Sequence, residues 1–246
     1  MDPGWWLMIL GAMLIGMAKT SFGGLGAVAV ALFAFTLPTR ESTAAALLLL
    51  IVGDVVAVLR YRRNADWGLL RGLLPAVIPG ILIGAGFIWA VDDLMLRRAI
   101  GVLLMCSVLI QLAITVRSDR KTGGGPARPA RALTVAAGVA AGFTTMAANA
   151  AGPVMAVYLQ LSRVEKLRFL GTSAWFYLIV NLSKTPLTGT LGLFTGQVLR
   201  VAALLVPVVL VGAVIGIGLV GRIQQRAFDI FTLLASALAA AALIVR

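Results

Sequence analysis

The sequence has no histidine and a single cysteine. Histidine is the commonest metal ligand and the usual acid–base group near neutral pH, so its absence argues against a catalytic or metal centre. Cys106 stands alone inside an apolar run, which excludes a disulfide within the chain. The chain also lacks a Walker-type glycine loop and acidic pairs spaced for catalysis. We therefore expect no enzyme activity, no cofactor and no metal.

Charged residues are scarce as well. They make up 12% of the chain, whereas 61% of its residues are hydrophobic and the mean hydropathy is +1.02. A soluble domain carries about 25% charged residues, so too little polar surface is present here to cover a core in water. The net charge of +12 falls in short clusters between apolar runs, a placement typical of membrane topology rather than of nucleic-acid binding. We predict an all-α integral membrane protein.

Six apolar segments have the length of about 20 residues that a membrane-spanning helix needs. They are residues 42–59, 69–90, 95–116, 167–184, 198–220 and 226–245. Two further segments, 5–35 and 133–161, are too long for one span and too short for two. Residues that interrupt helices divide both segments centrally. These residues are Gly23, Gly24 and Gly26 in the first segment and Asn149, Gly152 and Pro153 in the second.

The two halves of the chain share a pattern of glycine and proline. Four residues of the first half, Pro75, Gly80, Gly84 and Gly86, recur at a constant offset as Pro207, Gly212, Gly216 and Gly218. Upstream, Gly16 and Gly26 recur in the same way as Gly142 and Gly152. We interpret this as an internal duplication, with a first transmembrane repeat at 1–116, a polar basic cytoplasmic linker at 117–131 and a second repeat at 132–246. The glycines at 80, 84, 212 and 216 are interpreted as helix-packing positions.

The placement of basic residues predicts the orientation. If each long segment enters the membrane as two half-helices and returns to the same side, most Lys and Arg face the cytoplasm. Each half then has three full spans, an odd number, so the repeats have opposite orientations. The predicted fold is two inverted repeats, each a broken or re-entrant helix pair followed by three transmembrane helices, with both termini outside. The acidic start at Asp2 lacks the basic region of a signal peptide, so we expect the first segment to be retained.

Both helix breaks are candidate binding sites, because non-helical backbone at membrane depth is tolerated only where it is buried in protein or lines a cavity. The start of each second half-helix offers free N–H groups and a partial positive charge suited to an anion. The candidate substrate-binding residues are Lys19, Thr20, Ser21, Gly23 and Gly24 in the first break and Thr144, Thr145 and Asn149 in the second. The alternative interpretation is that these glycines only permit tight helix packing.

A polar stripe follows one face of the segment at 167–184. Its members are Ser173, Tyr177, Asn181, Lys184 and Thr188, which step by three or four residues. A lysine at mid-bilayer costs about 2.5–3.5 kcal/mol on insertion scales, so we expect this face to point into the bundle. Tyr177, Asn181 and Lys184 therefore join the candidate substrate-binding residues. Two alternatives stay open for Lys184: structural pairing, or snorkelling to an interface if the helix ends near Pro186.

Asp54 is the one acidic residue well inside a predicted span. It lies close to the position equivalent to Lys184 in the other half. Inverted symmetry would bring these two positions together near the pseudo-axis, so a pair between Asp54 and Lys184 is the hypothesis. Such a pair is either a structural bridge or a site of ion coupling.

Several short motifs, taken in their order and spacing, resemble the TauE/SafE sulfite-exporter family, also called the toluene-sulfonate uptake permease family. The motifs are Gly23-Gly24-Leu25-Gly26, Arg60-Tyr61-Arg62-Arg63, Ala151-Gly152-Pro153, Gly171-Thr172-Ser173-Ala174 and Asn181-Leu182-Ser183-Lys184-Thr185-Pro186. The resemblance covers about residues 5–245, and Asn149 stands where a glycine is more usual. It implies a multi-pass carrier in the bacterial inner membrane for sulfite, thiosulfate, sulfonates or related anions.

The expected function is a secondary transporter, a permease or exporter, that moves a small sulfur-containing or organic anion by alternating access. Its expected partners are that anion and the lipid bilayer, without nucleic acid. An anion channel is one alternative, because channels also use half-helix ends. A membrane subunit of a larger complex is the other.

Overall fold

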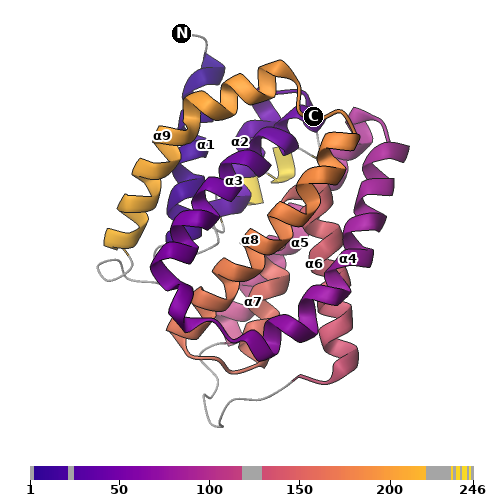
Figure 1. The fold of residues 1–246 in the computed structure, drawn as a ribbon. Coiled ribbons are helices and arrows are strands. Elements are labelled where there is room, and N and C mark those ends of the chain that lie inside the picture. The colour runs from indigo at the N-terminus through magenta and orange to yellow at the C-terminus, as the bar shows by residue number, and fades with distance from the viewer. Residues whose placement is uncertain are drawn as a thin grey trace.

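The computed structural model of the 246-residue chain describes residues 3–21, 25–117 and 129–219 and a few positions between 234 and 244. The described residues form helices and their connections, with no strand among them (Figure 1). In chain order the helices are α1 (Pro3–Thr20), α2 (Leu25–Thr36), α3 (Thr39–Tyr61), the 3-10 turn η1 (Arg62–Asn64), α4 (Trp67–Ala90), α5 (Asp93–Arg117), α6 (Arg131–Ala148), α7 (Gly152–Leu161), α8 (Lys166–Thr190) and α9 (Gly196–Leu219).

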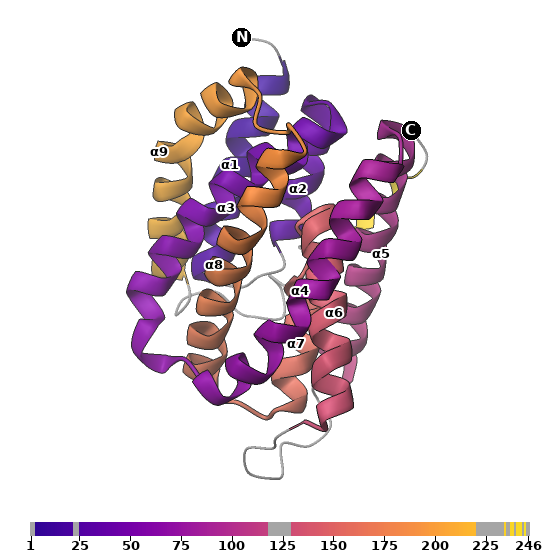
Figure 2. The same cartoon turned by 45° about the vertical axis from the view of Figure 1, so that its right-hand side comes forward.

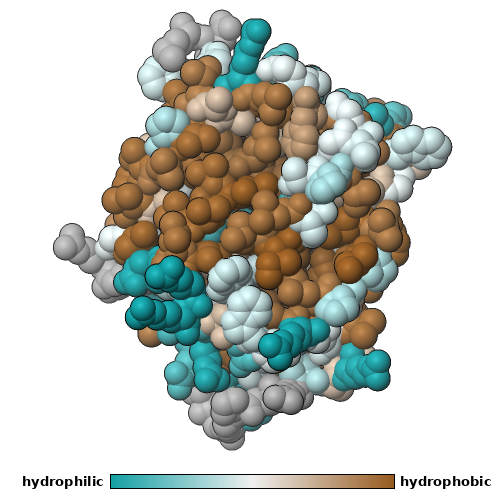
Figure 3. Space-filling model, in the orientation of Figure 1, coloured by the Kyte–Doolittle hydropathy of each residue, from teal (hydrophilic) through white to brown (hydrophobic). Residues whose placement is uncertain are grey.

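A wide apolar belt covers the face of the molecule in Figure 3, and hydrophilic residues gather toward its two ends. Large apolar side chains are exposed, among them Leu59 at 64%, Trp89 at 78% and Val214 at 68%. Four helices of the described part are long and apolar enough to cross a membrane: α3 together with η1, α4, α6 and α9. An exposed apolar surface of this kind is solvated by lipid rather than water. The prediction of an all-α membrane protein is confirmed.

Five of the six predicted spans coincide with long helices. Segments 42–59, 69–90 and 198–220 correspond to α3, α4 and α9. Segments 95–116 and 167–184 correspond to α5 and α8, which are 25 residues long and less apolar than the others. The sixth segment, 226–245, lies largely outside the described residues, as does most of the linker at 117–131.

The two long segments are each divided, as the sequence predicts. The first forms α1 and α2, which run antiparallel: a Cβ built on Gly11 would meet Phe33 at 2.9 Å, and one on Gly4 would meet Thr36 at 3.7 Å. The chain therefore turns back after α1, although Gly23 and Gly24 themselves lie outside the described residues. The second segment forms α6 and α7, separated by residues 149–151.

Helices α3 and α8 pack against each other through the middle of the bundle. On one side α1 contacts α2, α3 and α9, and on the other α6 contacts α4, α5 and α7 (Figures 1 and 2). Each of these two helices keeps an exposed face, with Leu59 of α3 and Leu182 of α8 at 64% and 51%, and a buried face turned to the bundle. Asp54 of α3 and Asn181 and Lys184 of α8 lie on the buried faces, and the site is built on them.

Glycines hold α1 against α9 and α4 against α6 at equivalent positions of the duplication. A Cβ on Gly16 would overlap the carbonyl oxygen of Val209, and a Cβ on Gly142 would overlap the carbonyl oxygen of Val77. Gly16 and Gly142 are equivalent in the duplication, and so are Val77 and Val209. The same contact therefore occurs once in each half.

The partner positions repeat in the same way. A Cβ on Gly80 would overlap the carbonyl oxygen of Val139, and one on Gly212 would overlap that of Met13. Contacts this close leave no room for any side chain, so backbone packs directly on backbone. The interpretation of Gly80 and Gly212 as packing positions is confirmed.

Candidate functional site

Four side chains from α1, α3 and α8 form the first cluster: Lys19, Asp54, Tyr177 and Asn181. The ammonium of Lys19 lies 2.7 Å from Oδ1 of Asp54, a carboxylate with no solvent exposure. The amide of Asn181 donates to the other carboxylate oxygen, Oδ2, at 2.6 Å. The same ammonium lies 4.3 Å from the centroid of the Tyr177 ring, a cation–π distance.

Gly53, next to Asp54 on α3, allows the side chain of Lys19 to lie close to the Asp54 carboxylate. A Cβ built on Gly53 would lie 2.9 Å from Cγ of Lys19, so the lysine stem packs on bare backbone beside Asp54. Lys19 stands in the last turn of α1, where unpaired carbonyls carry partial negative charge. Both charges of this cluster are therefore compensated, as buried charges need to be.

The second cluster joins α6, the second break and α8 through Lys184, Thr145 and Asn149. Lys184 is 1% exposed. Its ammonium donates to the carbonyl oxygen of Thr145 at 2.7 Å, to the Thr145 hydroxyl at 3.0 Å and to Oδ1 of Asn149 at 2.6 Å. All three N–H donors are thereby used, and each acceptor is a neutral oxygen. The hydrogen-bond partners of Lys184 in the second cluster thus include no carboxylate.

The backbone at the second break explains why Asn149 occupies its position. Asn149 has φ 52° and ψ 29°, a left-handed conformation that glycine adopts freely and asparagine tolerates best among the other residues. Its N–H donates to the Thr145 carbonyl at 3.0 Å and the next N–H, of Ala150, to Thr144 at 3.1 Å, which closes the end of α6. The Asn149 side chain then bridges Lys184 and, through Nδ2 at 3.0 Å, the carbonyl of Thr43.

The hypothesis that Asp54 pairs with Lys184 is wrong. Asp54 pairs with Lys19 and Asn181, whereas Lys184 binds the second break. Each of the two residues contacts the broken helix of its own half: Asp54 contacts Lys19 of α1, and Lys184 contacts Thr145 of α6.

Lys184 does not snorkel. This alternative required the helix to end near Pro186, whereas α8 continues through this proline to Thr190 and Lys184 is buried. Around this proline the hydroxyls of Thr185 and Thr188 bond to the carbonyls of Asn181 and Lys184, at 2.8 and 3.0 Å.

Three of the predicted site residues turn their hydroxyls to backbone carbonyls instead of joining a cluster. Thr20 donates to Ala213 of α9 at 2.9 Å and so joins two helices. Ser21 donates to Met17 and Thr144 to Ala140 within their own helices, at 2.5 and 2.8 Å. Gly23 and Gly24 lie outside the described residues.

Two residues of the site were not predicted from the sequence. Thr43 accepts a hydrogen bond from Asn149 through its backbone carbonyl and lines the cavity next to Lys184. Its side chain lies on the same face of α3 as Asp54, about three helical turns away. The hydroxyl of Tyr61 donates to the carbonyl of Thr20 at 2.9 Å and fixes the end of α1.

A small cavity of about 10 Å³ lies beside the second cluster. Its lining comprises Thr43, Leu47, Ile88, Met146, Asn149, Lys184, Thr188 and Leu193. A volume of this size admits about one water molecule. Within the described ranges, no three His, Cys, Asp or Glu residues come together in a way that could hold a metal ion.

Fold and site together define an all-α membrane protein with two charged clusters enclosed at its helix breaks. The model of the sulfite exporter TauE/SafE family matches residues 8–243, nearly the whole chain. The chain belongs to this family, which implies a membrane transporter of sulfur compounds. The comparison with curated proteins gave no match.

Proposed function

We propose that this chain is a secondary transporter for a small sulfur-containing or organic anion such as sulfite, thiosulfate or a sulfonate, and that it works by alternating access. It would be a multi-pass protein of the bacterial inner membrane and would perform no chemistry on its substrate. The observation that carries this proposal is the burial of Lys184 among neutral oxygens, with no carboxylate among its hydrogen-bond partners. A bound anion would supply the counter-ion that the protonated lysine needs.

The first cluster supports this assignment by contrast. Lys19 and Asp54 neutralise each other, so the two clusters together have one positive charge in excess. A buried charge without a partner is costly, and a bound anion removes that cost. The two clusters are neighbours on α8. Asn181 of the first cluster, which contacts Asp54, lies three residues before Lys184 of the second cluster and on the same face of the helix.

Alternating access is favoured by the size of the cavity beside Lys184. At about 10 Å³ it is too small for a sulfur oxyanion, so entry requires the helices around it to move. An open channel would need no such movement. We propose two inverted repeats as the moving framework, supported by the helix directions: α1 and α6 are equivalent and begin at opposite ends of the bundle (Figures 1 and 2).

The decisive experiment measures anion flux in proteoliposomes. We expect Lys184→Gln to abolish sulfite or sulfonate flux while the protein stays folded, because the amide removes the positive charge and keeps much of the side-chain volume. Lys166→Gln, the same change at the exposed first residue of the same helix, is the matched control and should keep normal flux. Unchanged flux in Lys184→Gln would remove this lysine from the site.

A second measurement separates a carrier from a channel. Saturable counterflow, in which a trapped anion drives uptake of a labelled one, supports alternating access. An ohmic current without counterflow would identify an anion channel. A thermal-shift screen against sulfite, thiosulfate, sulfonates and carboxylates would identify the preferred anion, because a ligand of the folded state raises apparent stability.

A further inference from the structure

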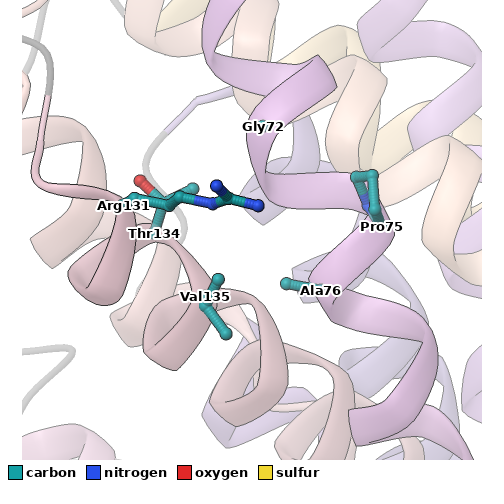
Figure 4. Close-up of a pocket in the computed structure, with 6 residues that line it drawn as sticks. All are labelled: Gly72, Pro75, Ala76, Arg131, Thr134 and Val135. Carbon is teal, nitrogen blue, oxygen red and sulfur yellow. The ribbon is translucent and has the colours of Figure 1, made fainter.

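A hollow of about 530 Å³ opens on the surface between the second and third turns of α4 and the start of α6. It shares no residue with either charged cluster. Its lining consists of Gly72, Pro75 and Ala76 of α4 and Arg131, Thr134 and Val135 of α6. Figure 4 shows the guanidinium of Arg131 extending from α6 across the hollow toward α4.

The hollow exists because α4 presents no large side chain at this level. Gly72 has none, and Ala76 is 9% exposed with its methyl turned against Gly138 of α6. A Cβ on Gly72 would lie 3.5 Å from Thr134, an ordinary contact, so close helix packing does not require this glycine. The space is therefore available to a ligand, and its walls are apolar apart from Arg131 and Thr134.

The position of the hollow along the helices matches the boundary between headgroups and hydrocarbon. Trp67, the first residue of α4, is 42% exposed and packs on Trp175 with ring centroids 5.2 Å apart. Tryptophans are enriched at that boundary. Arg131 is the first residue of α6, one of the helices able to cross a membrane. A cation at the interface beside an apolar hollow is complementary to an anionic phospholipid, which has a negative headgroup next to an apolar acyl chain.

The other half of the duplication lacks this arrangement. Leu204 is equivalent to Gly72, and Trp5 is equivalent to Arg131, whereas proline recurs as Pro75 and Pro207. Leu204 has a large side chain, 64% exposed, where Gly72 has none, and a tryptophan stands in place of the cation. The residues of the charged hollow therefore occur in one half only. General helix packing does not explain this difference, because the packing glycines recur in both halves.

We propose that this hollow binds a phospholipid with an anionic headgroup, its phosphate on Arg131 and the beginning of an acyl chain against Pro75 and Val135. In the topology proposed above this end of the bundle faces the cytoplasm, so the lipid would come from the inner leaflet. Only the choice of leaflet rests on the proposed function. The binding site rests on the residues themselves.

The test uses the purified full-length protein in neutral detergent, with phosphatidylglycerol, phosphatidylcholine of the same chains, or inorganic phosphate added. Native mass spectrometry counts bound lipid, and thermal unfolding reports its effect. We expect phosphatidylglycerol to bind more tightly than phosphatidylcholine and to raise the unfolding temperature more. Arg131→Gln should weaken phosphatidylglycerol binding about fivefold, which is the contribution of one arginine to binding at an anionic surface. Gly72→Leu should fill the hollow and remove tight binding.

Arg200→Gln, which removes an exposed arginine near the start of α9, is the matched control and should bind like the unaltered chain. Arg131→Lys keeps the positive charge and should retain most of the binding. If Gly72→Leu folds poorly, the comparison of Arg131→Lys with Arg131→Gln still distinguishes a lost charge from a lost structure. Equal phosphatidylglycerol binding in Arg131→Gln and the unaltered chain would overturn the proposal. So would an equal thermal shift with inorganic phosphate alone. Lipid binding is measured without transport, so failure of the proposed anion flux leaves this result intact.

Discussion

The two lysine clusters differ in what their ammonium groups contact. In the first cluster, Lys19 of α1 pairs with the carboxylate of Asp54 on α3. In the second cluster, Lys184 of α8 contacts only the neutral oxygens of Thr145 and Asn149. From this difference we predict that the first cluster stabilises the fold and that the second cluster binds the substrate.

The largest expected effect comes from breaking the pair in the first cluster. Asp54→Asn leaves Lys19 buried without a counter-ion, and removal of one partner of a buried pair costs about 3–5 kcal/mol. The free energy of unfolding in mixed micelles measures this cost. The double variant Lys19→Met/Asp54→Asn should recover more than half of the loss, because no unpaired charge then remains. A loss below about 1 kcal/mol in Asp54→Asn would show that the pair contributes no more than an exposed one.

Local signals in the sequence were sufficient to predict much of the fold. Composition and apolar run lengths gave the membrane class, and the glycines near 23–26 together with Asn149 marked both breaks. The contacts of Asp54 and Lys184 were not predictable in the same way. Their partners depend on which broken helix each long helix packs against, a property of tertiary contacts rather than of helix periodicity.

A smaller effect, equal in the two halves, is expected from the packing glycines. Gly80→Ala and Gly212→Ala should each lower the free energy of unfolding by about 1–3 kcal/mol, because the added methyl overlaps a backbone carbonyl of the facing helix. Gly86→Ala is the control on the same helix as Gly80, since a Cβ there would meet nothing within 4 Å. Thermal unfolding compares the three variants. Clearly unequal costs at 80 and 212 would show that the halves have diverged in packing as well as in charge.

The smallest effect concerns the backbone of the second break. Asn149→Gly and Asn149→Ala both remove the side-chain bonds to Lys184 and Thr43, but only alanine opposes the left-handed backbone. Alanine should therefore be less stable than glycine by about 1–2 kcal/mol. Denaturant unfolding of the two variants measures the difference. Identical stabilities would mean that the turn relaxes once the asparagine side chain is gone.

Three hydroxyl side chains predicted to bind the anion donate instead to a backbone carbonyl close by. Thr20, Ser21 and Thr144 carry the polar groups expected at an anion site, yet each is satisfied by a backbone carbonyl. In a low-dielectric interior a hydroxyl bonds to the closest carbonyl of its own or a neighbouring helix. Residue type alone does not reveal this. Thr43 was missed for the converse reason, since it contributes its backbone carbonyl rather than its hydroxyl.

The glycine contacts also limit how the molecule can move. Each half gives the first piece of its broken helix to the other half: α1 is joined backbone to backbone with α9, and α6 with α4. At Gly16, Gly80, Gly142 and Gly212 the backbones meet with no side chain between them, so we expect α1 to move with α9 and α6 with α4. When the two halves change conformation, each half would therefore carry the first helix of the other half with it.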